Sequence, residues 1–204
     1  MSSPYLGIFC SVNEEYALIP TNSPTEFKEV IKKELDVDPV ETTMAGTNLI
    51  GVFSAMNSEK IIVPDILEKE EMNVLKEIFS EVIVLEEKFT ALGNMITMND
   101  HGIVCSEPLK EILKEAEITK VAGSDFVGSC VFSTNTGFMT HPDALEKEIK
   151  VIEKALKVKG GIGTVNFGDP YVKTGMIGNS KGILVGKRTS GPELKRIDEI
   201  FILR

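Results

Sequence analysis

Two stretches of this chain share one pattern: Gly7-Ile-Phe-Cys-Ser-Val-Asn13-Glu-Glu-Tyr-Ala-Leu-Ile-Pro20 and Gly51-Val-Phe-Ser-Ala-Met-Asn57-Ser-Glu-Lys-Ile-Ile-Val-Pro64. In both, an asparagine follows the glycine by six residues and a proline follows it by thirteen. An apolar run, a polar turn and a second apolar run are typical of a β-hairpin. The shared spacing therefore predicts two hairpins of the same construction.

Related hairpins follow further along the chain, each with a polar turn between two apolar runs. The turn positions of the five copies are Asn13, Asn57, Asn99, Thr134 and Asn179. An amphipathic helix follows each hairpin, and a short strand such as residues 82–85 leads to the next one. Each unit is thus predicted to be ββαβ. We place the five repeats at about 5–43, 44–90, 91–123, 124–170 and 171–204, and we expect residues 1–204 to form a single domain.

Capping residues mark where the helices are expected to begin. Residues 23–26 (Ser-Pro-Thr-Glu) and 190–193 (Ser-Gly-Pro-Glu) combine a cap, a proline and a glutamate, which is a typical helix start. Asp65, Ser106 and the segment from Thr140 predict the starts of the other three helices.

One ββαβ unit leaves an apolar helix face and the edges of its sheet uncovered, whereas five units in a ring cover both. We therefore predict an α/β fold, a five-bladed, pseudo-fivefold α/β propeller of the pentein-like type built from ββαβ repeats. The axis is expected to be lined by glycines and small side chains, such as Gly93, Gly128 and Gly175.

The charge of the chain argues against a nucleic-acid-binding protein. The net charge of the 204 residues is −9, and lysines are scattered among glutamates along the predicted helices. Binding to a phosphate backbone relies on clustered Lys and Arg, so we expect little direct contact with nucleic acid. The sequence has no basic N-terminal segment followed by an apolar core, and no apolar run of membrane-spanning length. We expect a cytoplasmic protein with no membrane partner.

The three cysteines, Cys10, Cys105 and Cys130, lie in apolar runs and have no C-x-x-C spacing. Such cysteines are typical of buried free thiols in a reducing compartment. No group of His, Cys, Asp and Glu has the spacing of metal ligands. We expect no metal site and no cofactor.

Five-bladed ββαβ arrays also resemble the guanidino-modifying enzymes, which use a nucleophilic Cys, a His and carboxylates around the central cavity. In those enzymes the nucleophilic Cys belongs to the final repeat, but residues 171–204 contain no Cys. The two histidines, His101 and His141, lie in a predicted turn and at a predicted helix start. An enzyme of this kind is the alternative hypothesis. Our expectation is that the protein is not an enzyme and has no catalytic residues.

Six motifs follow one another between residues 90 and 194, on the frame of the five repeats. They are Thr90-Ala-Leu-Gly-Asn94, Val127-Gly-Ser129, Thr140-His-Pro142, Gly163-Thr-Val-Asn-Phe-Gly168, Asn179-Ser-Lys-Gly182 and Thr189-Ser-Gly-Pro-Glu-Leu194. With this frame, the chain resembles the archaeal members of the translation initiation factor 6 family over essentially its whole length. The resemblance implies a factor of protein biosynthesis and ribosome biogenesis. Such a factor binds the joining face of the large ribosomal subunit and sterically prevents association with the small subunit.

The resemblance also implies a partner and a set of contacts. The partner is mainly a basic ribosomal protein at the joining face, and we expect the factor itself to be a monomer. We expect its large-subunit contacts at Gly93 and Asn94 and at the turn residues Asn57 and Asn99. A structural role is the alternative for the two turn residues, because Asn readily adopts left-handed conformations and bonds its own backbone. Which end of the ring docks stays open.

Overall fold

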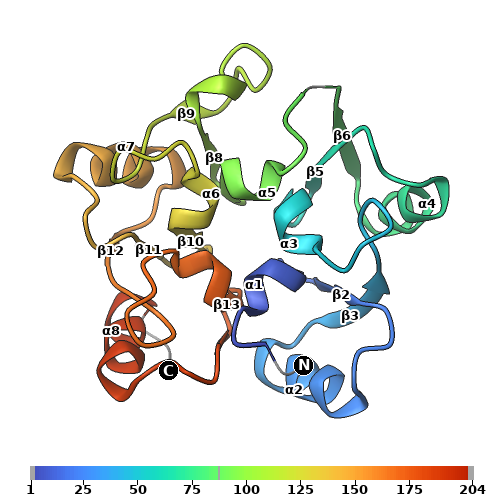
Figure 1. Cartoon of the computed structure of the whole chain (residues 1–204), viewed down its shortest axis with the longest axis horizontal. Coiled ribbons are helices and arrows are strands. Elements are labelled where there is room, and N and C mark those ends of the chain that lie inside the picture. The colour runs from blue at the N-terminus through green and yellow to red at the C-terminus, as the bar shows by residue number, and fades with distance from the viewer. Residues whose placement is uncertain (1–2, 87, 202–204) are drawn as a thin grey trace.

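Five small sheets surround a central axis in the computed structural model, which describes residues 3–86 and 88–201 (Figure 1). The sheets are β1-β2-β3, β4-β5-β6, β7-β8-β9, β10-β11-β12 and β13-β14. We number the blades 1 to 5 in this order. The strands are β1 Ser11–Val12, β2 Tyr16–Pro20, β3 Asp38–Thr42, β4 Ala55–Met56, β5 Lys60–Pro64, β6 Glu81–Leu85, β7 Ile96–Asn99, β8 Gly102–Cys105, β9 Glu117–Ile118, β10 Val131–Ser133, β11 Phe138–Thr140, β12 Gly160–Ile162, β13 Met176–Gly178 and β14 Ile183–Val185.

Each blade begins with an antiparallel hairpin, and in blades 1 to 4 the third strand joins the second in parallel. In blade 1, for example, Ser11 pairs with Leu18, and Leu18 pairs with Val40. The helix that connects the second and third strands covers the outer side of the blade. This arrangement confirms the predicted five-bladed α/β propeller of ββαβ repeats.

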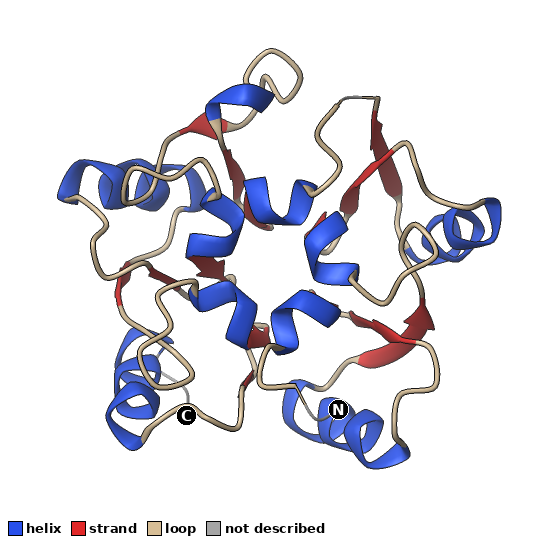
Figure 2. Cartoon of the chain, in the orientation of Figure 1, coloured by secondary structure: helices blue, strands red, loops and turns tan. Residues whose placement is uncertain are grey.

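A short helix precedes the first strand of every blade, where the sequence predicted that the apolar run would be strand throughout. These inner helices are α1 Leu6–Phe9, α3 Ile50–Phe53, α5 Leu92–Met95, α6 Val127–Cys130 and the 3₁₀ helix η2 Val172–Gly175. They form a ring around the axis on the side facing the viewer in Figure 2. Short apolar runs do not distinguish a buried strand from a buried helix, so the prediction of continuous strands was wrong for these residues.

The outer helices are α2 Thr25–Leu35, α4 Lys69–Ile78, α7 Glu146–Leu156 and α8 Gly191–Phe201. Blade 3 has instead the 3₁₀ helix η1, Glu107–Leu109, followed by turns, so the helix predicted from Ser106 is wrong. Only residues 106–116 connect β8 to β9, whereas residues 21–37 connect β2 to β3. The shorter connection leaves too little chain for a regular helix and its two loops.

Helices α4 and α7 begin later than their predicted starts at Asp65 and Thr140. The reason is a glutamate in the first turn of each helix. Glu71 accepts a hydrogen bond from the backbone N–H of Glu68 at 2.8 Å, and Glu148 accepts one from that of Leu145 at 2.9 Å. Each carboxylate satisfies a donor that would otherwise lack a partner at the helix N-terminus, and so sets the start of the helix.

The apolar cores lie largely between neighbouring blades. One cluster joins Leu18 of blade 1 to Ile61 and Leu75 of blade 2, and another joins Ile62 of blade 2 to Ile96 of blade 3. Each blade therefore buries its surface only when its neighbours are in place. Cys10, Cys105 and Cys130 are buried free thiols, as predicted, and burial raises their pKa values to about 12, 12 and 11.

Candidate functional site

The hairpin turns at one end of the ring are joined by asparagine side chains. The amide nitrogen of Asn13 donates to the backbone oxygen of Asn57 at 2.8 Å, and that of Asn57 donates to the oxygen of Asn99 at 3.2 Å. Asn99 continues the series to Thr134, and Asn179 donates to Asn13. Each of these links crosses from one blade to the next. We call this end of the ring the turn end.

The turn asparagines also close their own hairpins. The side-chain oxygen of Asn57 accepts the N–H groups of Glu59 and Lys60, and that of Asn99 accepts those of His101 and Gly102. Asn57 and Asn99 are only 8% and 5% exposed. Their amide groups are therefore engaged inside the protein, and the structure does not bring these two residues together with Asn94.

The opposite end of the ring, which we call the helix end, is formed by the five short helices. Their second residue is glycine in four blades: Gly7, Gly51, Gly93 and Gly128. A Cβ at any of these positions would overlap the carbonyl oxygen of the short helix next to it in the ring. These glycines allow the helix backbones to touch. Glycine is needed here because a side chain would overlap the neighbouring backbone, and not because φ is unusual. Gly93 is buried in this contact.

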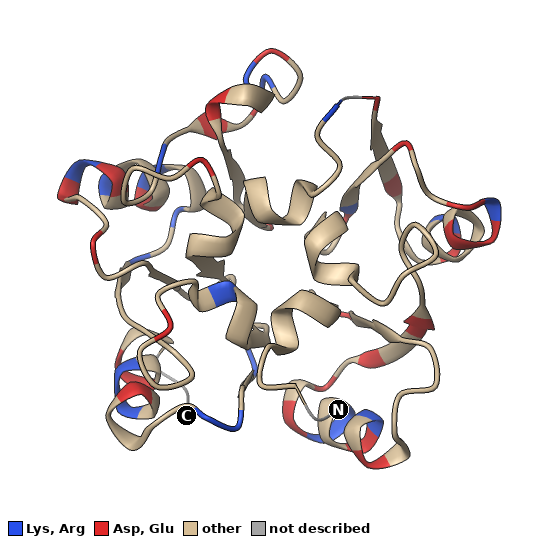
Figure 3. Ribbon diagram, in the orientation of Figure 1, with Lys and Arg blue, Asp and Glu red and all other residues tan. Residues whose placement is uncertain are grey.

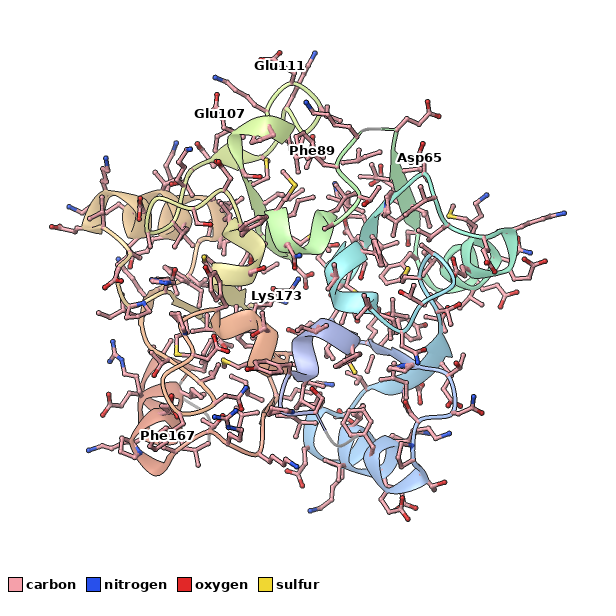
Figure 4. The ribbon with its side chains drawn as sticks, viewed as in Figure 1. Asp65, Phe89, Glu107, Glu111, Phe167 and Lys173 are labelled. Carbon is pink, nitrogen blue, oxygen red and sulfur yellow. The ribbon has the colours of Figure 1, made fainter. Side chains whose placement is uncertain are left out.

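Lys173 occupies the corresponding position of the fifth short helix, η2. Its side chain lies at the axis (Figure 4), where the ammonium group donates to the carbonyl oxygens of Gly51 at 3.1 Å and Gly93 at 2.7 Å. Burial lowers the pKa of Lys173 to about 8. This residue was not predicted from the sequence, although an alignment of the five repeats on their glycine shows lysine in its place.

Asn94 follows Gly93 on α5 and is half-buried at the edge of a hollow of about 280 Å³ on the helix end. The hollow extends over four of the short helices and the segments before them. Its lining residues are Tyr5, Ile8, Asn94, Phe126, Ser129, Asp169, Tyr171 and Thr174. Phe126 is 55% exposed and Tyr171 is 42% exposed. Asn94 was predicted from the sequence but these two aromatic residues were not, because their exposure depends on how the blades pack.

A further aromatic residue stands out at the edge of blade 5, away from the axis (Figure 4): Phe167 is 80% exposed. It has a φ of 69°, in the left-handed region that bulky residues rarely adopt. Glu193 holds its turn by accepting the N–H groups of Phe167 at 3.1 Å and Gly168 at 2.9 Å. Burial opposes ionisation of Glu193, but these bonds and those from Ser190 and Thr164 outweigh it and lower its pKa to about 2.

Charges are distributed unevenly between the helices (Figure 3). The outer helices carry many acidic and basic residues, whereas the short helices carry a single charged side chain, Lys173. The helix end therefore offers an apolar and amide-bearing surface near the axis, with charged residues farther out. Such a surface is typical of the central part of a protein interface.

The interior of the ring offers little for catalysis. A cavity of about 60 Å³ on the axis is lined by apolar and hydroxyl side chains together with Cys10 and Lys173. Burial raises the pKa of the Cys10 thiol and so disfavours the nucleophilic thiolate, and the ammonium group of Lys173 is bonded to two carbonyl oxygens. His101 is exposed in its turn, and the ring of His141 packs edge-on against Tyr171. Across residues 3–86 and 88–201, no group of three or more His, Cys, Asp and Glu could hold a metal ion. No helix in this part of the chain is long and apolar enough to cross a membrane.

Comparison with known proteins shows similarity over nearly the whole chain. The eIF-6 family matches residues 1–200. Translation initiation factor 6 of Methanoculleus marisnigri is 35% identical, with 97% of this chain and 94% of that protein covered. The factor of the same name from Saccharolobus islandicus is 36% identical, with coverages of 95% and 92%.

Among solved structures, DDAH from Pseudomonas aeruginosa, in complex with citrulline, is similar with a TM-score of 0.49 and 12% identity, over 76% of this chain and 68% of that one. Both sequence relatives named above, and one from Pyrococcus abyssi, are archaeal proteins named as translation initiation factors. With a match from residue 1 to residue 200, this chain belongs to the eIF-6 family.

Proposed function

We propose that this protein binds the large ribosomal subunit at its joining face through the helix end of the ring, and so sterically prevents association with the small subunit. The observation that carries this proposal is the hollow beside Asn94. Exposed Phe126 and Tyr171 border it, and rigid aromatic side chains around a depression are typical interface anchors. The relatives named translation initiation factor 6 support a partner in the translation apparatus.

Asn94 then lies at the interface, Gly93 lies directly beneath it, and Asn57 and Asn99 support the ring from the turn end. Asn94 offers an amide donor and acceptor at the edge of the hollow, whereas Gly93 sets the close packing of the short helices beneath it. The amides of Asn57 and Asn99 hold neighbouring blades in position. We therefore assign the direct contact to Asn94 and the supporting roles to the other three residues.

The charge of the protein favours a basic ribosomal protein as the main partner, with little direct contact to ribosomal RNA. A net charge of −9 repels a phosphate backbone and attracts a basic surface. Complementary charge accelerates encounter and makes binding sensitive to salt. A cytoplasmic monomer that covers part of the joining face needs no catalytic group, and the buried thiols and scattered histidines suit a protein that is not an enzyme.

Co-sedimentation of the purified protein with large ribosomal subunits tests this proposal. We expect the parent protein to pellet with large subunits at low salt and to reduce their joining to small subunits. Asn94→Ala removes an amide at the interface, which is worth about 1–3 kcal/mol, or roughly five- to two-hundredfold in affinity. Asn94→Asp keeps the size of the side chain, adds a negative charge and also weakens binding unless a basic partner attracts the new carboxylate.

Asn73→Ala is the matched control, because Asn73 is exposed on the outer helix α4. It should bind as the parent does, and all three variants should melt at the parental temperature. A parent protein that does not bind large subunits at low salt contradicts the function. Parental binding by both Asn94 variants would instead exclude the helix end as the docking surface.

A further inference from the structure

Lys173 is the one departure from the glycine ring at the helix end. Four short helices place glycine at their second position, and the fifth places a lysine there. The lysine belongs to blade 5, but its ammonium group bonds the carbonyl oxygens of Gly51 in blade 2 and Gly93 in blade 3. The side chain therefore spans the axis and connects blades that are not neighbours of its own.

The ammonium group has no acidic partner among residues 3–86 and 88–201. The elements packed against η2 are α1, α6, β10 and β13, and the two carbonyl acceptors lie on α3 and α5. The ionisable groups on or next to these elements are the thiols of Cys10 and Cys130 and the phenol groups of Tyr5 and Tyr171, and both phenol groups line the hollow on the helix end. Burial raises the pKa values of these thiols to about 12 and 11, so both stay neutral while Lys173 titrates.

The bond to Gly93 reaches the residue proposed to contact the partner. The carbonyl group of Gly93 and the N–H group of Asn94 belong to one planar peptide, so an interaction that holds the oxygen also orients the start of Asn94. The same N–H donates to the carbonyl oxygen of Ala91 at 3.0 Å. Lys173 and Ala91 thus hold this peptide group from its two sides.

We propose that Lys173 is a positioning residue for the docking surface, which acts by holding the Gly93–Asn94 peptide and the short helices α3 and α5 in place. This inference rests on the proposed function, because it assigns the binding contact to Asn94. A glycine at position 173 would complete the symmetry of the ring but would leave both carbonyl oxygens without this donor. The lysine therefore adds an interaction that packing of the short helices alone does not supply.

The test compares Lys173→Met with Lys76→Met. Methionine keeps an unbranched chain without a donor, and Lys76 is an exposed control on α4. By NMR, the backbone amide signals of Gly51, Gly93 and Asn94 should titrate with a midpoint near pH 8 in the parent. In Lys173→Met these signals should be displaced and lose the titration, whereas Lys76→Met should leave them unchanged.

The second part of the test measures binding to large subunits in a double-mutant cycle. We expect Lys173→Met to weaken binding about tenfold in the parent but to have almost no further effect in Asn94→Ala, because the lysine acts through Asn94. Additive losses, or an Asn94 signal that does not follow the titration of Lys173, would overturn the proposal.

Two outcomes separate this inference from its premise. If the parent does not bind large subunits, the proposed function fails and the positioning role fails with it, while the NMR titration still decides whether Lys173 holds the peptide. If Lys173→Met does not fold, the titration of the parent and the binding of Lys173→Arg decide instead. Arginine keeps the donors and should retain binding within about threefold, and a tenfold loss in a folded Lys173→Arg variant would count against the proposal.

Discussion

The two ends of the ring use repeated residues in different ways. At the turn end, every blade except blade 4 has a buried asparagine in its hairpin turn. The amide nitrogen of each asparagine donates a hydrogen bond to the neighbouring blade. At the helix end, repeated glycines bring the backbones together, and the residues that differ between blades, such as Asn94, Phe126 and Tyr171, stay accessible. The positions that repeat hold the ring closed, and the positions that differ are free to recognise a partner.

The largest effect is expected from a side chain at the glycine contact. In Gly51→Ala, the new Cβ would overlap the carbonyl oxygen of Gly7, and only a shift of the backbone could relieve the overlap. Overpacking that can be relieved only by moving the backbone is severely destabilising, so we expect a loss of at least about 4 kcal/mol. Urea unfolding followed by circular dichroism measures the loss.

Gly191→Ala is the control for this substitution, because a Cβ at Gly191 would meet nothing within 4 Å. It should leave the free energy of unfolding nearly unchanged. If Gly51→Ala is as stable as Gly191→Ala, the helix end is not held by close backbone contact, and the contrast between the two ends is incorrect.

The turn end should respond strongly to loss of one of its amides. Asn99 donates to the carbonyl oxygens of Thr134 and Leu156, and accepts from two N–H groups of its own turn. Asn99→Ala leaves these buried groups without partners, so we expect a loss of about 3 kcal/mol. Thermal melting measures the loss, with exposed Asn73→Ala as the control. Weakened subunit binding in an Asn99→Ala variant of parental stability would instead assign a contact role to Asn99.

Much of the architecture could be predicted because it is encoded locally and repeated. The spacing of glycine, asparagine and proline marks the hairpins, and five copies with uncovered faces require closure into a ring. The short inner helices could not be predicted in this way, since their geometry depends on contact with the next blade. The missing helix after Ser106 depends on the length of the connection to β9, which the apolar pattern does not show.

The candidate site was less predictable than the fold. Asn57, Asn94 and Asn99 all stand beside apolar runs in the sequence, yet only Asn94 reaches the hollow. Burial separates them, and burial is a property of the assembled ring. Lys173 was not predicted as a functional residue, although the repeat pattern contains the evidence for it. A charged residue in a slot that is otherwise glycine is a departure from symmetry that can be read from sequence alone.

A titratable group at the helix end should make stability depend on pH. The pKa of Lys173 falls from 10.5 to about 8 on folding, so between these values the unfolded chain holds a proton that the folded protein has released. The contribution of Lys173 to stability should therefore rise as the pH increases from 8 to 10.5. The difference between these two pKa values corresponds to about 3 kcal/mol of stability if the side chain is completely buried. Because Lys173 is partly exposed, we expect a gain of about 2 kcal/mol.

The measurement is the difference in unfolding free energy between the parent and Lys173→Met at pH 7 and pH 10. Because the other lysines and the carboxylates are common to both proteins, their titrations cancel in this difference. A difference that does not vary with pH would show that Lys173 titrates at its ordinary value and that the axis is not a desolvated environment.

The smallest effect, and the only gain, is expected where the turn end lacks a link. The slot in blade 4 holds Thr134, whose hydroxyl accepts the N–H of Thr136 within its own turn and has no amide to donate to blade 5. Thr134→Asn should keep the acceptor and direct a new donor to the backbone oxygen of Asn179, as Asn13 does to Asn57. One added buried hydrogen bond should stabilise the protein by about 1 kcal/mol and raise the melting temperature by about 2–4 °C. Thr136→Asn, at an exposed position of the same turn, should not. If Thr134→Asn is no more stable than Thr136→Asn, the blade 4 to blade 5 junction is held by other contacts, and the asparagine links are features of particular junctions rather than a rule for the whole turn end.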